Sequence, residues 1–172
     1  MHISFKKFTL EDVPLYYEWA EKPHVKNVWF LDGYQPKEYI LKKIEGNGIE
    51  FPFIILANNK PIGHIQYWDI FARDQIETET NDYFTGEPEG TFGIDIFIGE
   101  ENYLGKGYGT KALLKFTELL FERYNAKKIV IDPSLNNKQA IRSYEKAGFQ
   151  FVRLSKDAIS GETVLMELFK PQ

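Results

Sequence analysis

The sequence predicts an α/β protein of the α+β kind, with a mixed, mostly antiparallel central sheet flanked by about four helices. Several segments alternate apolar and polar residues, as half-buried strands do. Short turn sequences join two pairs of these segments and predict antiparallel hairpins. Other segments carry apolar residues at three- and four-residue steps, as amphipathic helices do. The 172 residues can form one domain, 1–172, because no linker or internal repeat divides them.

Composition narrows the classes of function. The apolar and charged fractions, 43% and 27%, are typical of a globular protein, and no apolar run is long enough to span a bilayer. The N-terminus lacks an apolar core of signal-peptide length and the chain has no cysteine, so we expect a cytoplasmic protein without a membrane partner. It is expected to be a monomer or a homodimer.

Metal and nucleic acid are not expected as partners. Without cysteine the chain has no thiol nucleophile and no cysteine metal site, and its histidines, His2, His24 and His64, show no paired spacing. The net charge of −4 argues against a nucleic-acid partner, because such binding depends on neutralising phosphates. A small-molecule ligand is therefore the expectation.

The N-terminal half begins with a strand and a helix. Ile3 and Phe5 alternate with polar residues in a short strand. The helix that follows is predicted to use Asp12 as its N-cap, to hold Pro14 in its first turn and to place Trp19 on its buried face.

A second helix and a hairpin complete this half. The helix is predicted to start at Gln35-Pro36 and to stop near Gly46. Residues 51–57 and 61–70 then form two β-rich runs, and the turn cluster 58–60 between them predicts an antiparallel hairpin.

Residues 71–90 lose periodicity and are strongly acidic between Asp74 and Glu89, which predicts a loop. Two interpretations of this acidic flap remain open. It is either a solvated surface loop or a binding loop in which Tyr83 and Phe84, set among carboxylates such as Asp82, hold a cationic ligand.

Residues 91–98 alternate cleanly and predict a strand with an unusual carboxylate, Asp95, in its middle. An isolated acid of this kind often faces solvent. Because Asp95 lies just before a glycine-rich loop, we favour a position in a cleft beside that loop. The opposite face of the strand carries the residues Phe92, Ile94, Ile96 and Ile98.

The glycine-rich loop is the central feature of the chain. It follows the strand and opens a helix that carries Leu113, Phe116 and Leu120 on one face. Glycines let a backbone present N–H groups outward, and a helix N-terminus adds further unpaired N–H groups, so the segment predicts a phosphate site. A flexible turn is the plain alternative. The loop consists of Leu104, Gly105, Lys106, Gly107, Tyr108, Gly109 and Thr110.

The C-terminal part supplies a strand, a helix and a closing hairpin. The strand 128–131 ends in Asp132, and Asn136 or Asn137 is expected to cap a helix that contains Tyr144 and ends at Gly148. The runs 149–154 and 163–169 then predict a hairpin around Ser160-Gly161.

These motifs resemble those of the GNAT N-acetyltransferase superfamily. The run from Leu104 to Gly109 resembles its acetyl-CoA pyrophosphate loop, and Asn137 with the run from Tyr144 to Phe149 resembles its second cofactor motif. The order of elements fits a GNAT-like fold from Ile3 to Met166. Leu104 departs from the Arg or Gln of many members. The segments Gly93-Ile94-Asp95 and Asp132-Pro133-Ser134 are most similar to the aminoglycoside 6′-N-acetyltransferases.

The resemblance implies an acetyl-CoA-dependent N-acetyltransferase, with acetyl-CoA as co-substrate and a polycationic small molecule as acceptor. Asp95 matches the general base and Tyr144 the residue near the cofactor sulfur, although a helix residue such as Tyr144 also fits core packing. Asp132 resembles an acid that holds a substrate amine. The acceptor is expected to contact Asp82 and Tyr83 in addition to Asp95 and Asp132.

By the same resemblance, the pantetheine arm is expected along the backbone of Ile96, Phe97 and Ile98, with Asn137 either binding the arm or capping its helix. The pyrophosphate is expected at the loop from Leu104 to Thr110.

Other functions remain open. The acceptor could be another amine, such as a polyamine, an amino acid or a peptide N-terminus, and a non-catalytic acetyl-CoA-binding protein would share the fold. A dinucleotide-dependent oxidoreductase, with Asp132 as its ribose acid, is disfavoured because Thr110 occupies the third glycine position and no βαβ context is present.

Overall fold

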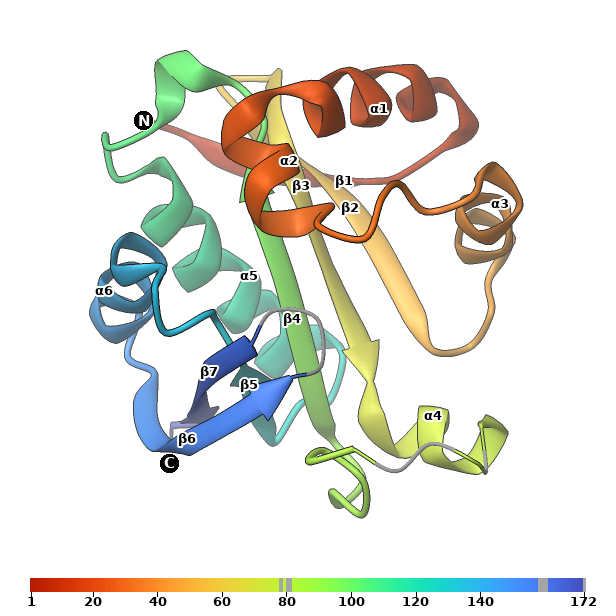
Figure 1. Ribbon diagram of the computed structural model, residues 1–172, viewed down its shortest axis with the longest axis vertical. Helices are drawn as coiled ribbons and strands as arrows, with labels where there is room; N and C mark the ends of the chain where they lie inside the picture. The colour runs from red at the N-terminus through yellow and green to blue at the C-terminus, as the bar shows by residue number, and fades with distance from the viewer. Residues whose placement is uncertain (78, 80–81, 158–160, 172) are drawn as a thin grey trace.

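The computed structural model covers residues 1–172 and describes all of them except 78, 80–81, 158–160 and 172 (Figure 1). The strands are β1 (Ile3–Lys7), β2 (Glu50–Ala57), β3 (Lys60–Asp69), β4 (Thr91–Ile98), β5 (Lys128–Ile131), β6 (Gln150–Asp157) and β7 (Gly161–Phe169). The helices are α1 (Val13–Glu21), α2 (Pro23–Trp29), α3 (Lys37–Glu45), α4 (Ile70–Ile76), α5 (Tyr108–Arg123) and α6 (Lys138–Lys146), with short 3-10 helices η1 (Leu10–Asp12) and η2 (Glu101–Tyr103).

Within the described residues, the strands form one seven-stranded sheet in the order β1-β2-β3-β4-β5-β7-β6. Every neighbouring pair is antiparallel except β4 and β5, which are parallel. The predicted fold class, a mixed and mostly antiparallel sheet flanked by helices, is therefore confirmed. The four predicted helices correspond to α1, α3, α5 and α6, and sequence reasoning did not identify α2 or α4.

The hairpins follow from local sequence. Asn58 and Asn59 both have positive φ, 47° and 65°, and this conformation joins β2 to β3 in a tight turn that asparagine tolerates well. The antiparallel pairing of β6 with β7 confirms the closing hairpin. Ser160, in its predicted turn, lies outside the described residues.

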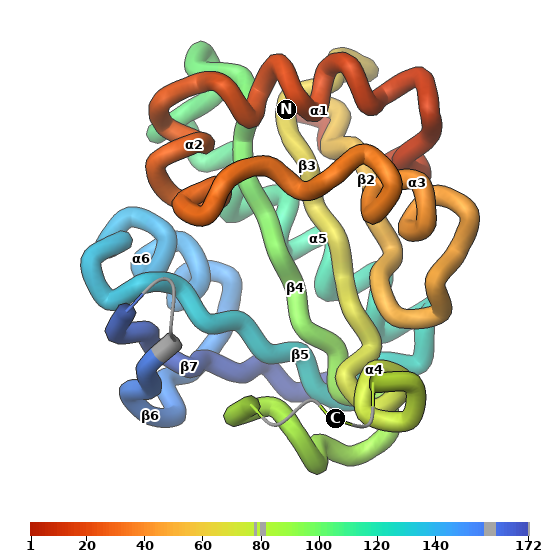
Figure 2. The backbone as a smooth tube through the Cα atoms, turned by 45° about the vertical axis from the view of Figure 1, so that its right-hand side comes forward, coloured from red at the N-terminus to blue at the C-terminus, as the bar shows by residue number. Residues whose placement is uncertain are grey.

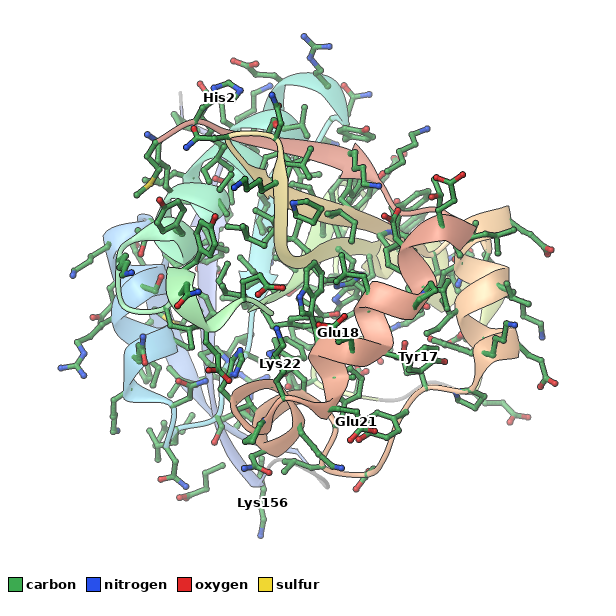
Figure 3. The ribbon with its side chains drawn as sticks, turned by 90° about the horizontal axis from the view of Figure 1, so that it is seen from above. His2, Tyr17, Glu18, Glu21, Lys22 and Lys156 are labelled. Carbon is green, nitrogen blue, oxygen red and sulfur yellow. The ribbon has the colours of Figure 1, made fainter. Side chains whose placement is uncertain are left out.

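Helices cover both faces of the sheet (Figure 1). On one face, α5 buries Leu113, Phe116 and Leu120, as their spacing predicted. On the other, Trp19 of α1 is fully buried near Phe97 of β4. Figure 3 shows the side chain of Tyr17 on the side of α1 that faces the segment before α3. No helix among the described residues is long and apolar enough to cross a membrane.

Two capping predictions have different outcomes. Asn137 caps α6 by accepting a hydrogen bond from the Ala140 N–H at 3.1 Å. Asp12 occupies the N-cap position of α1, but its side chain does not cap that helix. Its carboxylate instead accepts from the Thr9 N–H at 2.9 Å and pairs with Lys6, because Asp12 is the N3 residue of η1 and completes the capping box of that short helix.

The acidic flap is not a loop throughout. Its first residues form α4, which begins where Asp69 accepts a hydrogen bond from the Ala72 N–H at 3.0 Å. The helix buries Ile70 and the side chain of Arg73. The loop prediction was therefore wrong at this end, because a capping acid and two inward-facing residues suffice for a short helix that shows little periodicity in the sequence.

Candidate active site

Two neighbouring strands separate in the middle of the sheet. β4 and β5 pair only from Thr91 to Gly93 with Lys128 to Val130, and β4 then continues to Ile98 while β5 ends at Ile131. Figure 2 shows β5 beside only the lower part of β4. Among the described residues, the upper part of β4 therefore has β3 on one side and no paired strand on the other.

The register decides which backbone groups face this open edge. The Gly99 N–H donates to the Ile62 carbonyl at 2.9 Å, and hydrogen-bonded pairs recur at every second residue of an antiparallel ladder. The backbone of Phe97 is thus directed toward β3, and those of Ile96 and Ile98 toward the open edge. We therefore expect Ile96 and Ile98, rather than Phe97, to offer backbone groups to a bound arm.

A cavity of about 530 Å³ lies beside this edge. Five of the predicted site residues line it together, although they come from three separate segments: Asp95 and Phe97 in β4, Asp132 after β5, and Asn137 and Tyr144 at the start and in the body of α6. The sequence prediction that Asp95 faces a cleft is supported by this placement.

Asp95 is held by a neutral donor. The Gln66 side-chain amide donates to Asp95 Oδ2 at 2.7 Å. Burial raises the pKa of the Asp95 carboxyl above its ordinary value, while the Gln66 hydrogen bond and the charge of Lys43 lower it, and Glu50 raises it. A carboxylate with a raised pKa, partly accessible from a cavity, is suited to accept a proton.

Tyr144 combines core packing with access to the cavity. Its side chain is 6% exposed and its ring lies 6.2 Å from that of Phe149. Burial raises the pKa of the Tyr144 hydroxyl, with further contributions from the charges of Asp95 and Asp132. The hydroxyl therefore stays protonated at neutral pH and is able to donate a hydrogen bond.

Tyr83 of the flap contacts a residue of the cavity wall. The Tyr83 hydroxyl donates a hydrogen bond to Asp132 Oδ2, and the Arg153 guanidinium lies 5.8 Å from the Tyr83 ring centre. Asp132 thus forms part of the cavity wall and is oriented from the flap. Tyr83 touches the predicted site but is not among the cavity-lining residues.

Asp82 is engaged elsewhere. Arg73 pairs with Asp82 at 2.8 Å and with Asp74 at 2.8 Å, and Glu87 pairs with Lys128 at 2.5 Å. Asp82 does not line the cavity. One of the two interpretations of the sequence was a flap that binds a cation, but these ion pairs engage the carboxylates of Asp74, Asp82 and Glu87 within the protein.

The glycine-rich loop lies at the other end of β4 from the flap (Figure 1). Gly105 and Gly107 have positive φ, 67° and 80°, and a side chain at either would meet no atom within 4 Å. Gly107 is the N-cap of α5, whose first-turn N–H groups have no preceding carbonyl of the helix to bind. This exposed, left-handed backbone next to a helix N-terminus fits a pyrophosphate.

Side chains near the loop hold it in place. Lys106 donates to the Asn102 carbonyl at 2.7 Å, and the hydroxyls of Thr110 and Ser143 lie 2.7 Å apart, which ties α5 to α6. The rings of Tyr103 and Tyr108 pack edge to face at 4.8 Å. The Leu104 residue is 36% exposed.

Sequence reasoning missed one whole wall of the cavity. This wall comes from α1, α2 and the segments around α3, and includes Tyr16, Trp29, Phe30, Asp32, Gln35 and Lys43. Next to it, burial lowers the pKa of His64 to about 3, so this ring is neutral. No motif marks these residues. The only signal was the cluster of aromatic residues between positions 16 and 34.

Family comparison agrees with this geometry. Residues 9–156 match the family described as acetyltransferase (GNAT) domain. With a divided β4–β5 pair and a glycine loop before α5, the chain belongs to the GNAT acetyltransferase family and is an acetyl-CoA-dependent N-acetyltransferase.

Individual relatives have related activities. The aminoglycoside N(6′)-acetyltransferase type 1 of Klebsiella pneumoniae is 33% identical over 154 residues, which are 86% of this chain and 74% of the relative. The spermine/spermidine N(1)-acetyltransferase of Bacillus subtilis is 39% identical over 94 residues, 54% of this chain and 60% of the relative. The structure of AAC(6′)-Ib with ribostamycin and coenzyme A has a TM-score of 0.86 at 29% identity and covers 99% of this chain and 94% of that one.

Proposed function

We propose that this enzyme acetylates the 6′-amine of an aminoglycoside. The observation that carries the proposal is the meeting of Asp95, Asp132 and Tyr144 in one cavity, beside the edge where β4 and β5 separate. The similarity to aminoglycoside 6′-N-acetyltransferases over most of the chain supports it. Acetyl-CoA supplies the activated acetyl group.

Asp95 is the proposed general base. An ammonium group cannot attack a carbonyl, so the acceptor amine must lose a proton, either to Asp95 directly or through a water. The raised pKa of the Asp95 carboxyl strengthens it as a base relative to an exposed aspartate, provided that it is ionised. Its negative charge also attracts the cationic acceptor.

Backbone groups of β4 and the Tyr144 hydroxyl are the proposed partners of the charge that develops during the transfer. The N–H groups on the open edge of β4, at Ile96 or Ile98, are the proposed donors to the acetyl oxygen. Tyr144 is the proposed donor to the departing sulfur. Because its pKa is raised, we expect it to stabilise the thiolate by a hydrogen bond more than by complete proton transfer.

The cavity suits a compact cation. Asp32, Asp95 and Asp132 line it, while the charge of Lys43 is matched by Glu50 at 2.7 Å. A volume of about 530 Å³ lies in the range of small-molecule sites and accommodates a sugar-sized part of the acceptor. These features support an amino sugar over an acidic or neutral amine.

Release of free thiol from acetyl-CoA, measured across aminoglycosides, polyamines, amino acids and peptides, tests this proposal. We expect the highest kcat/KM with aminoglycosides that have a 6′-amine, and a weaker apparent affinity at high salt because exposed charges are screened. Faster acetylation of spermine or of an amino acid would instead assign the enzyme to another acceptor class.

A further inference from the structure

A buried lysine lies behind the proposed base. Lys43 of α3 has a side chain that is only 5% exposed. Its ammonium group contacts Glu50 at 2.7 Å, the Gln66 side-chain oxygen at 3.2 Å and the Gln35 side-chain oxygen at 3.2 Å. It also lies 4.7 Å from the centre of the Tyr39 ring. A buried cation is retained only where such partners compensate for its loss of water.

These contacts give Gln66 a single favourable orientation. An ammonium group can only donate hydrogen bonds, and an ionised carboxylate can only accept them. The Gln66 oxygen therefore faces Lys43, and its amide nitrogen faces Asp95 at 2.7 Å and Glu50 at 3.4 Å. The reverse orientation would place the NH₂ group against a cation and the oxygen against an anion.

The segment before α3 fixes the other end of this network. The Tyr17 hydroxyl of α1 donates to the Gln35 backbone carbonyl at 2.8 Å, in the region where Figure 3 places Tyr17. The Gln35 side chain in turn contacts Lys43. The ammonium group is thus held from α1, α3, β2 and β3, and its charge has a defined place behind Asp95.

Other ionisable groups also surround Asp95, and they come from each element packed around it. They are Tyr16 of α1, Asp32 before α3, Tyr39 and Lys43 of α3, Glu50 of β2, His64 of β3, Asp132 after β5 and Tyr144 of α6. His64 is neutral, because burial lowers its pKa to about 3, and burial raises the pKa values of these tyrosines. Lys43 is therefore the cation of this group.

We propose that Lys43 is a positioning residue for the acetyl transfer: it orients the Gln66 amide toward Asp95 and, by its charge, keeps the Asp95 carboxylate ionised at the pH of the reaction. This inference rests on the proposed role of Asp95 as the base. Glu50 has the opposite electrostatic effect on Asp95, since its negative charge opposes ionisation. The Lys43–Glu50 pair thereby sets how basic Asp95 is.

A direct titration of Asp95 tests this proposal. The side-chain carboxyl carbon of Asp95 is followed by NMR in protein labelled with ¹³C-aspartate, and its signal is assigned with Asp95→Asn. We expect Lys43→Met to raise the midpoint by about one pH unit or more, the usual effect of losing a nearby opposite charge. We expect Glu50→Gln, the matched control, to lower it. Both variants break the Lys43–Glu50 ion pair, so an effect of that break alone would move the Asp95 midpoint in the same direction in both. Midpoints that move in the same direction, or that do not move, would overturn the proposal.

Either single variant leaves a buried charge without its partner and can fail to fold. The double variant Lys43→Met/Glu50→Gln leaves neither charge. The charge of Lys43 has a larger effect on the pKa of Asp95 than the charge of Glu50 has. We therefore expect the titration midpoint of Asp95 in the double variant to lie above that in the parent. A midpoint at or below that of the parent would contradict the proposal.

The kinetic consequence separates the two proposals. For one fixed acceptor, the acidic limb of kcat/KM is expected to move to higher pH in Lys43→Met, with the KM for acetyl-CoA unchanged. If Asp95→Asn keeps the parent's kcat, Asp95 is not the base, and the NMR titration still decides whether Lys43 controls its ionisation. If Lys43→Met raises the NMR midpoint of Asp95 as expected but leaves the acidic limb of kcat/KM at the parent's pH, the catalytic part of the inference is wrong.

Discussion

Replacing Gly107 should remove the binding of acetyl-CoA without unfolding the protein. Gly107 has a φ of 80°, and a built side chain meets no atom within 4 Å. Gly86 offers a matched control, since its φ is 86°, its site is equally open and it lies in the flap. Gly107→Val and Gly86→Val therefore impose a similar backbone strain, and only the first obstructs the proposed pyrophosphate site.

The size of both effects can be estimated. A left-handed conformation costs a non-glycine residue roughly 1–2 kcal/mol. At about 2–4 °C per kcal/mol for a chain of this length, each variant should lower the Tm by at least about 2–8 °C. Acetyl-CoA at a hundredfold excess over its Kd should stabilise the parent by about 2.7 kcal/mol, or about 5–11 °C.

Thermal unfolding with and without acetyl-CoA measures both effects in one assay. We expect the parent and Gly86→Val to show the full rise in Tm with acetyl-CoA, and Gly107→Val to show none. If Gly107→Val responds as strongly as Gly86→Val, the loop before α5 does not bind the pyrophosphate and the reasoning from its backbone conformation is wrong.

Three further variants test other parts of the site. Arg73→Met should lower the free energy of unfolding by about 1–3 kcal/mol in denaturant titrations, because it removes the ion pairs with Asp74 and Asp82, and an unchanged value would show that these ion pairs do not stabilise the flap. Asp95→Asn should become more stable relative to the parent as pH rises from about 4. The pKa of the Asp95 carboxyl is raised in the folded state, so the parent loses stability as pH rises through that pKa, whereas the variant has no charge to bury. A difference in the free energy of unfolding between variant and parent that is the same at pH 4 and pH 8 would contradict the burial of this charge. Tyr144→Phe should lower kcat at neutral pH by less than Asp95→Asn does, for which about 10²–10⁴-fold is expected, and the reverse order would make Tyr144 the more important residue.

The sequence predicted those parts of the site that local pattern encodes. The alternation of residues 91–98 places Asp95 on the face opposite Ile94 and Ile96, and this separation is present in β4. The turn at Asn58-Asn59 and the cap at Asn137 likewise depend on neighbours within a few residues. Such features can be predicted because the physical cause and its effect lie within one short segment.

The missed features depend on contacts between distant segments. Nothing near Lys43 in the sequence indicates that its ammonium group is buried, because Glu50 and Gln66 belong to other elements. The length of α2, from Pro23 to Trp29, is too short for a clear periodicity. The ion pair of Arg73 with Asp82 shows why the charge of the flap could not be interpreted from composition alone.

The central claim is that Asp95 activates the 6′-amine of an aminoglycoside in this cavity. The most direct measurement compares the rate of acetyl transfer to two aminoglycosides that differ only in carrying an amine or a hydroxyl at the 6′ position, for the parent and for Asp95→Asn, with the acetylated position determined by NMR. We predict fast transfer to the 6′-amine by the parent, little transfer to the hydroxyl compound, and a loss of about 10²–10⁴-fold in kcat in Asp95→Asn. Equal rates for the two acceptors, or an undiminished rate in Asp95→Asn, would contradict the claim.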